Sequence, residues 1–154
     1  WANEGFTDAL GLTDQEDGEA NTQKLRESGI AANIPILEYC KDGWYLPARN
    51  EMEAVFNAYN GRPSQSIGLK PDAIKQEEKD ARAAWDKILT DNGGDVMNVK
   101  ADNTAGDSYF TSTEADDASK VFYVRFGQWN PGLTGAKYAK SPARYVRCIR
   151  KISK

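Results

Sequence analysis

The chain contains no histidine among its 154 residues. Histidine is the most common general base, proton shuttle and zinc ligand, so its absence excludes Ser-His-Asp and Cys-His catalysis within this sequence. No apolar run is long enough to cross a membrane. The formal net charge is only −3, and the seven Lys or Arg residues at positions 137–154 are interpreted as a solvated strand face. Nucleic acid is therefore not an expected partner.

Cysteine is scarce, with only Cys40 and Cys148. They cannot form a CxxC redox pair, and two thiols cannot complete a zinc site. The residues themselves leave two alternatives open: two buried thiols or one long-range disulfide. The acidic stretch Asp14–Gly18 superficially resembles a calcium loop, but the EF-hand positions that need acids hold Thr13 and Lys24. We therefore expect no metal and no cofactor.

The length indicates one domain over residues 1–154, and because the chain starts at Trp rather than Met we expect a processed or trimmed product. Apolar spacing, capping residues and stop signals predict four helical segments: Thr22–Ser28, a second start at Asn33–Pro35, Ala48–Asn60 and Pro71–Leu89. Period-two alternation predicts strands at Val121–Phe126 and Tyr145–Ile152. Helices first and strands last predict an α+β fold.

The same patterns assign side chains to the core or to the surface. The core assignments are Trp44, Tyr45, Leu46, Phe56, Trp85, Phe122, Phe126 and Val146. The predicted buried stripe of the helix over 71–89 consists of Ala81, Ala84, Trp85, Ile88 and Leu89. Tyr123 and Arg125 fall on the face of the first strand that we predict to be exposed. Gly127–Ala143, between the two strands, is interpreted either as a binding loop or as an ordinary long hairpin loop.

Three segments, in order along the chain, and one earlier turn resemble one bacterial domain family. Gly43–Pro47 with Glu51 resembles the family's GWYLPS–x–x–E segment. Tyr109–Glu114 resembles its YWSSTE, and Tyr145–Arg150 resembles its YVRCVR. Asp17–Thr22 resembles the DG–x–x–NT turn that precedes its first helix. The chain is thus similar to the Fibrobacter succinogenes major paralogous domain and to the Lcl C-terminal domain, both similar to the C-type-lectin-like fold.

The resemblance implies two main helices packed on a small, twisted, mostly antiparallel sheet with long loops. It also implies a disulfide between Cys40 and Cys148, because such folds commonly pair a cysteine of the first major helix with one of the last strand. That bond would fit an oxidising compartment. The chain departs from the family where Ala48 replaces a cap serine, at a cost of about 1 kcal/mol, and where Phe110 replaces the second aromatic of YWSSTE. A strand pair usually precedes the segment that resembles Trp1–Gly5, and without it we expect an exposed sheet edge unless another segment covers it.

The motifs argue against two activities known in this fold. Calcium-binding lectins use an acid after Trp-Asn, which Gln128–Pro131 lacks, so calcium-dependent sugar binding is not expected. The formylglycine-generating enzymes need a metal-bound cysteine pair, whereas Cys40 and Cys148 are better explained as helix-to-strand partners. Glu114 and Arg147 are candidates for an ion pair between the two motif strands. As a catalytic acid, Glu114 would need a second group with a separated pKa, and none is evident.

The resulting prediction is a non-enzymatic ligand-binding module of a secreted or surface-attached bacterial or phage protein, located at the cell surface or outside the cell. It would bind a protein or a glycan through the surface formed by Asp116–Ala143. The alternatives are a display protein diversified by a retroelement and a structural module of a surface appendage or adhesin. The predicted contacts are Asp116, Asp117, Tyr123, Arg125, Trp129, Asn130 and Tyr138.

Overall fold

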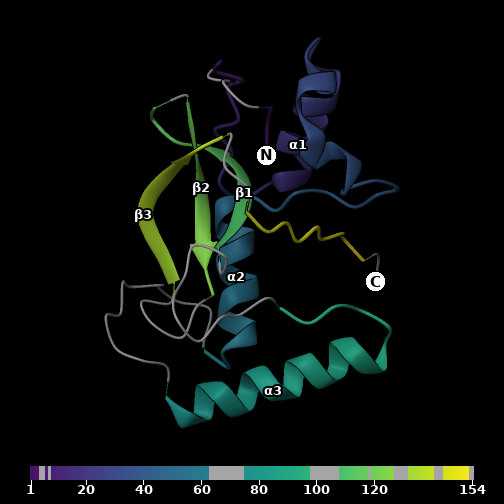
Figure 1. Cartoon of the computed structure of the whole chain (residues 1–154), viewed down its shortest axis with the longest axis vertical. Coiled ribbons are helices and arrows are strands. Elements are labelled where there is room, and N and C mark those ends of the chain that lie inside the picture. Colours follow the sequence, from purple (N-terminus) through teal and green to yellow (C-terminus); the bar gives the residue numbers. More distant parts are fainter. Residues whose placement is uncertain are drawn as a thin grey trace.

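The computed structural model describes residues 1–3, 6, 8–62, 75–97, 108–117, 119–126, 132–140 and 144–152, with only the backbone for 132–139. Within these residues the elements follow in the order α1 (Gly18–Glu27), η1 (Ala31–Asn33), η2 (Pro35–Glu38), α2 (Arg49–Tyr59), α3 (Gln76–Asp91), β1 (Ser108–Glu114), β2 (Lys120–Arg125) and β3 (Gly132–Ala139). The two η elements are short 3-10 helices. Figure 1 shows helices first and strands last, so the predicted α+β class is confirmed.

The three strands form an antiparallel sheet in the order β1-β2-β3, and both faces of the central strand β2 are buried. Tyr123 packs in one cluster with Leu25 of α1, whereas Val124 and Phe126 pack in a second cluster with Phe56 of α2. Successive strand residues point to opposite faces, so the two clusters cover the two sides of β2. The prediction that Tyr123 is exposed is therefore wrong, and the side chain is only 2% accessible.

Helix α1 begins four residues before the predicted start. Its cap is Asp17, whose carboxylate accepts a hydrogen bond from the N–H of Ala20 at 3.0 Å. Asn21 and Thr22, at the predicted start, are instead buried inside the helix. Thr22 Oγ1 accepts the N–H of Leu46 at 3.0 Å, which ties α1 to the strand-like segment before α2.

The segment after α1 forms the two 3-10 helices rather than a second α-helix, with Pro35 at the first position of η2 and Tyr39 as its C-cap. Cys40 follows directly and is bonded to Cys148, with 5.5 Å between the two Cα atoms. Of the two cysteine alternatives, the structure has the long-range disulfide. This disulfide joins the first third of the chain to the C-terminal segment.

Helix α2 confirms its prediction to within one residue at each end. Ala48 cannot accept a capping hydrogen bond, but tertiary contacts supply the missing partners. The N–H of Arg49 donates to Oγ1 of Thr113 at 3.0 Å, and the N–H of Asn50 donates to the carbonyl of Gln15 at 2.9 Å. The cost expected for the missing cap is thereby offset by β1 and by the loop before α1.

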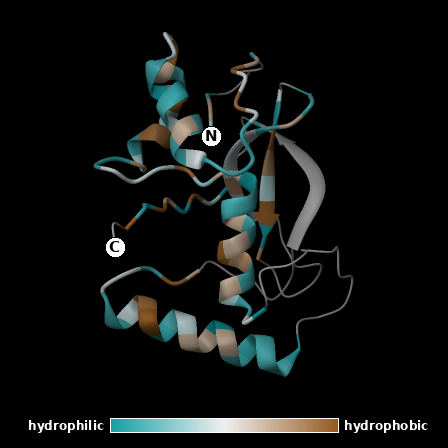
Figure 2. Cartoon of the chain, turned by 180° about the vertical axis from the view of Figure 1, so that it is seen from behind, coloured by the Kyte–Doolittle hydropathy of each residue, from teal (hydrophilic) through white to brown (hydrophobic). Residues whose placement is uncertain are grey.

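Helix α3 lies across the end of α2 and apart from the sheet (Figures 1 and 2). Its predicted stripe is not buried: Trp85 is 39% and Ile88 52% accessible. The buried side chain of α3 is Arg82, whose Nε donates to Oδ1 of Asn60 at 2.8 Å and whose guanidinium lies over the ring of Tyr59. Polar contacts, more than apolar burial, therefore hold α3 against α2. Residues 71–74 of the predicted helix lie outside the described part of the chain.

Residues 144–152 are extended and are held by two isolated bridges, so the predicted second strand is only partly formed. Tyr145 pairs with Tyr109 of β1 in parallel, and Ile149 pairs with Tyr45 in antiparallel fashion. Val146 packs against the cluster that contains Leu25, whereas Tyr145 packs against the cluster on the other side of the sheet. The predicted alternation of this segment is therefore confirmed, although Val146 is only partly buried.

The outer edge of β1 is covered rather than exposed. The N–H of Phe110 donates to the carbonyl of Tyr145 at 3.1 Å, and the N–H of Ser112 donates to that of Pro47 at 2.8 Å. The N–H of Glu114 donates to the carbonyl of Leu12 at 2.8 Å. Other segments thus cover this edge, which is the alternative to an exposed sheet edge that the sequence left open.

The carboxylate of Glu114 pairs with the buried ammonium of Lys140, not with Arg147 as the two motif strands suggested. It also accepts the N–H groups of Leu10 and Leu12 at 2.9 and 3.0 Å. This arrangement fastens the N-terminal segment to the sheet. The guanidinium of Arg147 instead points to the groove described below.

Candidate binding groove

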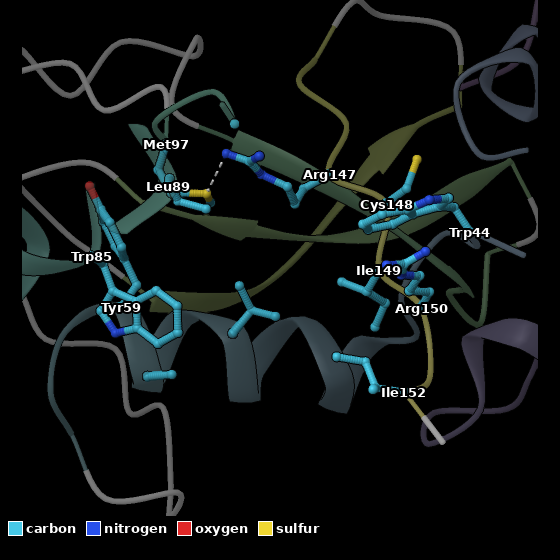
Figure 3. A pocket seen from close by; sticks show the side chains of 13 residues that line it. Trp44, Tyr59, Trp85, Leu89, Met97, Arg147, Cys148, Ile149, Arg150 and Ile152 are labelled. Carbon is cyan, nitrogen blue, oxygen red and sulfur yellow. Dashed lines mark hydrogen bonds between the residues drawn. The ribbon is translucent and has the colours of Figure 1, made fainter. Parts of the chain in front are cut away.

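A groove of about 520 Å³ opens between α2, α3 and the extended C-terminal segment (Figure 3). Its lining is mostly apolar and comes from segments far apart in the sequence. These residues are Trp44, Val55, Ala58, Tyr59, Trp85, Leu89, Gly94, Met97, Arg147, Cys148, Ile149, Arg150 and Ile152.

The groove exists because α2 buries one face and α3 does not close over the other. Met52 and Phe56 point into the core, whereas Val55 and Ala58 of the same helix line the groove. The two helices are tethered where the hydroxyl of Tyr59 donates to the carboxylate of Asp86, at 3.2 Å. With this tether in place, Trp85 and Leu89 form one wall (Figure 3).

Trp44 forms the opposite end of the groove, and its indole is 40% accessible rather than buried as predicted. The backbone of Trp44 is held by two hydrogen bonds: its N–H donates to the carbonyl of Lys41 at 2.9 Å, and its carbonyl accepts from Arg26 at 3.1 Å. The guanidinium of Arg150 lies 4.9 Å from the centre of the indole ring. This cation–π contact presents the indole to the groove while one of its faces is covered.

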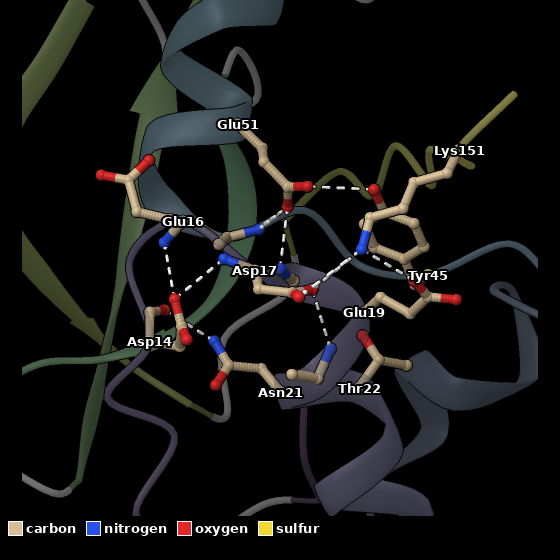
Figure 4. A network of polar contacts seen from close by, with 12 residues as sticks. Asp14, Glu16, Asp17, Glu19, Asn21, Thr22, Tyr45, Glu51 and Lys151 are labelled. Atoms are coloured by element: carbon tan, nitrogen blue, oxygen red, sulfur yellow. Dashed lines mark hydrogen bonds and ion pairs between the residues drawn. The ribbon is translucent and has the colours of Figure 1, made fainter. Parts of the chain in front are cut away.

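A network of polar contacts fixes the segment that carries Trp44 relative to α1 and α2 (Figure 4). The carboxylate of Glu51 accepts three hydrogen bonds, from the N–H groups of Gly18 and Ala48 at 2.9 and 2.8 Å and from the hydroxyl of Tyr45 at 2.9 Å. One side chain thus joins the starts of both helices to the segment that carries Trp44. The glutamate of the GWYLP–x–x–x–E segment has a structural role here.

The C-terminal segment enters the same network through Lys151, which pairs with Glu19 at 2.9 Å and with Asp17 at 3.4 Å. The hydrogen bond to Glu19 raises the pKa of Lys151, and the N–H of Ala20 lowers the pKa of Asp17. Burial, followed by the bond to Glu51, raises the pKa of Tyr45 to about 12. These shifts have structural causes and leave each group in its usual charge state at neutral pH.

Positive charge enters the described lining of the groove through Arg147 and Arg150. Nη2 of Arg147 donates to the carbonyl of Asp95 at 2.8 Å and contacts the sulfur of Met97 at 3.2 Å. Burial and the nearby Asp86 carboxylate raise the pKa of Tyr59, so its hydroxyl stays protonated. The groove is therefore an apolar surface with positive charge along one side.

The side chains that line this groove are suited to contacts with a partner. The described residues contain no group of three or more acids or cysteines that could hold a metal ion. The hydroxyl of Tyr59 is engaged by Asp86, and none of the described lining residues is a carboxylic acid. Aromatic rings, methionine side chains and guanidinium groups, all present in this lining, are enriched at protein interfaces.

The sequence-predicted contacts lie elsewhere. Asp116 and Asp117 are exposed after β1, and Asp117 pairs with Lys120 at 2.6 Å and accepts from Ser119 N–H, which lowers its pKa. Tyr123 is core and Arg125 is half-buried. Of these four described contacts, none lines the groove. Trp129, Asn130 and the side chain of Tyr138 lie outside the described residues.

Sequence reasoning missed Trp44 and Trp85 as surface residues because it assigned both to the core. A signal was available for Trp85. The sixteen-residue helix α3 has large apolar side chains only at Trp85, Ile88 and Leu89, which lie within about one turn. So short a stripe cannot bury a helix of that length. No comparable local signal distinguishes Trp44 from its buried neighbours Tyr45 and Leu46.

Comparisons of the chain with protein-family models, with curated proteins and with solved structures found no match. Among the described residues, no helix is both long and apolar enough to cross a membrane.

Proposed function

We propose that this chain is a non-enzymatic binding module that holds a protein ligand in the groove between α2, α3 and residues 147–152. One observation carries the proposal. The indoles of Trp44 and Trp85, 40% and 39% accessible, line the same groove from opposite ends. Tryptophan and arginine supply most of the binding energy when a partner covers them, so this groove is the part of the described surface best suited to a partner.

A protein ligand fits the groove better than a glycan. Sugars need several polar partners for their hydroxyl groups, and here the described polar side chains facing the groove are Arg147, Arg150 and the hydroxyl of Tyr59, which Asp86 already engages. Leaving ligand hydroxyl groups unpaired in an apolar site costs about 1–3 kcal/mol each. Apolar side chains of a protein have no such cost.

We further propose that the module is exported and has a C-type-lectin-like fold. The bond between Cys40 and Cys148 supports export, since disulfides persist in oxidising compartments. The fold proposal is supported by the packing of α1 and α2 against the sheet and by the link from the early helical region to the last extended segment. The segments Gly43–Pro47, Tyr109–Glu114 and Tyr145–Arg150 lie side by side, joined by backbone hydrogen bonds.

The proposal can be tested by selecting ligands from a random library, which does not require the partner to be identified first. Ten-residue peptides displayed on phage would be selected against the disulfide-bonded chain, and a glycan array would be probed with the same protein. We expect peptides to be enriched and the array to stay negative. Affinity for a synthetic copy of an enriched peptide should fall by about 30-fold or more in Trp85→Ala, the loss of one interface hot spot.

Ile88→Ala is the matched control, because Ile88 is exposed on the same helix but does not line the groove. It should bind the peptide as the unaltered chain does. Equal affinity in Trp85→Ala and Ile88→Ala would contradict the proposal, and so would a positive glycan array with no enriched peptide.

A further inference from the structure

One edge of the C-terminal segment is bonded to the fold at Tyr145 and Ile149, and the other edge is open with respect to the described residues. Both backbone groups of Tyr145 bond to β1, and both of Ile149 bond to Tyr45. In an extended chain the N–H and C=O of neighbouring residues point to opposite edges. Those of Val146, Cys148 and Arg150 therefore point away from β1. Within the described part of the chain, no hydrogen bond reaches the backbone of these three residues.

We propose that the ligand binds by β-strand addition: an extended polypeptide segment from outside residues 1–154 pairs with this open edge and places alternate side chains in the groove. The inference rests on the proposed function, since it names the binding mode of the same site. Backbone hydrogen bonds would supply affinity and the groove would select side chains.

The position of the groove supports a strand rather than another shape. The lining of the groove includes Arg147, Cys148, Ile149 and Arg150. The open edge at Cys148 and Arg150 therefore lies beside the groove. Residues two apart in a strand repeat every ~6–7 Å, so Val146, Cys148 and Arg150 offer ladder positions over about 13 Å. A partner strand of about five or six residues would satisfy all three positions.

Charge identifies the chemistry of the added strand. Residues 144–152 contain four Lys or Arg and no acid. Pairing two copies of this segment antiparallel would place like charges opposite one another, which is destabilising. An incoming segment with apolar residues in alternation and at least one Asp or Glu would instead meet Arg147 or Arg150. The proposed ligand is thus an extended segment with alternating apolar residues and at least one acidic residue, and not a second copy of this chain.

The test uses the peptides selected above against the full disulfide-bonded chain. Enriched sequences should show period-two hydrophobicity with an acidic residue. In the synthetic peptide, N-methylation of every second amide removes donors from one edge only, and N-methylation of the other amides removes them from the opposite edge. One of the two methylated peptides should bind about 3- to 10-fold more weakly for each hydrogen bond lost, and the other should bind nearly normally.

A matched pair of variants tests the same edge by changing the protein instead of the peptide. Arg150→Pro removes the side chain and the unpaired N–H, whereas Arg150→Ala removes only the side chain. The exposed, extended position should tolerate both, checked by circular dichroism. Arg150→Pro should bind about 3- to 10-fold more weakly than Arg150→Ala.

The outcomes separate the two proposals. If Trp85→Ala loses binding while neither methylation pattern nor Arg150→Pro has an effect, the groove binds its ligand but strand addition is wrong. If the chain dimerises in sedimentation and Arg150→Pro abolishes the dimer, a second copy is the occupant and the external strand is wrong. If no peptide is enriched, both proposals are overturned.

Discussion

Gly18→Ala should destabilise the protein although alanine is the better helix former. A Cβ at this first position of α1 would lie 2.4 Å from the backbone N of Ala48 and 2.4 Å from the carbonyl O of Leu46. It would also lie 2.6 Å from Oε2 of Glu51, the acceptor of the Gly18 N–H. These separations are too short for any side chain, so α1 must move away from the start of α2.

The magnitude follows from three opposing contributions. Helix propensity favours alanine by about 1 kcal/mol at most. Overpacking against backbone costs about 1–3 kcal/mol. Weakening the hydrogen bond to the Glu51 carboxylate costs about 1.5–3 kcal/mol. The free energy of unfolding should therefore fall by about 2–5 kcal/mol, measured by urea unfolding with the disulfide intact.

Gly29→Ala is the control for this prediction, because a Cβ at Gly29 would meet nothing within 4 Å. It should leave stability unchanged or raise it by up to about 1 kcal/mol. The close packing of α1 on α2 would be refuted if Gly18→Ala and Gly29→Ala unfolded within about 0.5 kcal/mol of each other.

Three further predictions concern the contacts that hold the scaffold. Lys140→Met should cost about 3–5 kcal/mol in urea unfolding, because the buried Glu114 carboxylate loses its counter-charge. Adding Glu114→Gln should recover part of that loss, and no recovery would argue against an electrostatic cause. Replacing Cys40 and Cys148 together by alanine should cost about 4–5 kcal/mol, because the bond closes a separation of 108 residues. A cost below about 1 kcal/mol would contradict this. Because the folded-state pKa of Tyr45 is raised to about 12, the unfolded chain releases its proton first, so stability should fall as pH rises from about 10 to 12. Tyr45→Phe should unfold with a shallower slope in that window, and an unchanged slope would exclude this residue as a cause.

The features that sequence reasoning predicted correctly are those with a local or motif-level signal. The helical spacing of Met52, Val55, Phe56 and Tyr59 predicted α2, and all of these side chains except Val55 are buried. The motif resemblance implied the bond between Cys40 and Cys148, which neither spacing nor composition could have chosen over two free thiols.

The errors arise where tertiary packing decides. Period-two alternation assumes one buried face, but α1 and α2 lie on opposite sides of β2, so Tyr123 is buried as well. A local helical stripe predicted burial for Trp85, but no element of the described structure covers that face of α3. The partner of Glu114 was also beyond sequence reasoning, because Lys140 reaches it through the fold of the sheet.

The candidate site was the least predictable part. The groove is assembled from Trp44, from α2, from α3 and from residues 147–152, which are distant in sequence. Its positive side comes from Arg147 and Arg150, which belong to a segment whose period-two alternation predicted only a strand. A sequence pattern within one segment cannot predict a groove that forms between several distant segments.

The most direct test of the central claim is to map the contact surface by amide chemical shifts of the isotope-labelled chain on addition of a selected peptide. Our account predicts the largest shifts at Met97 and at residues 147–150, together with the indole N–H of Trp85, and little change at Asp116 and Asp117. Shifts confined to 116–125, with the groove unchanged, would contradict it and would return the binding surface to the strand-loop region.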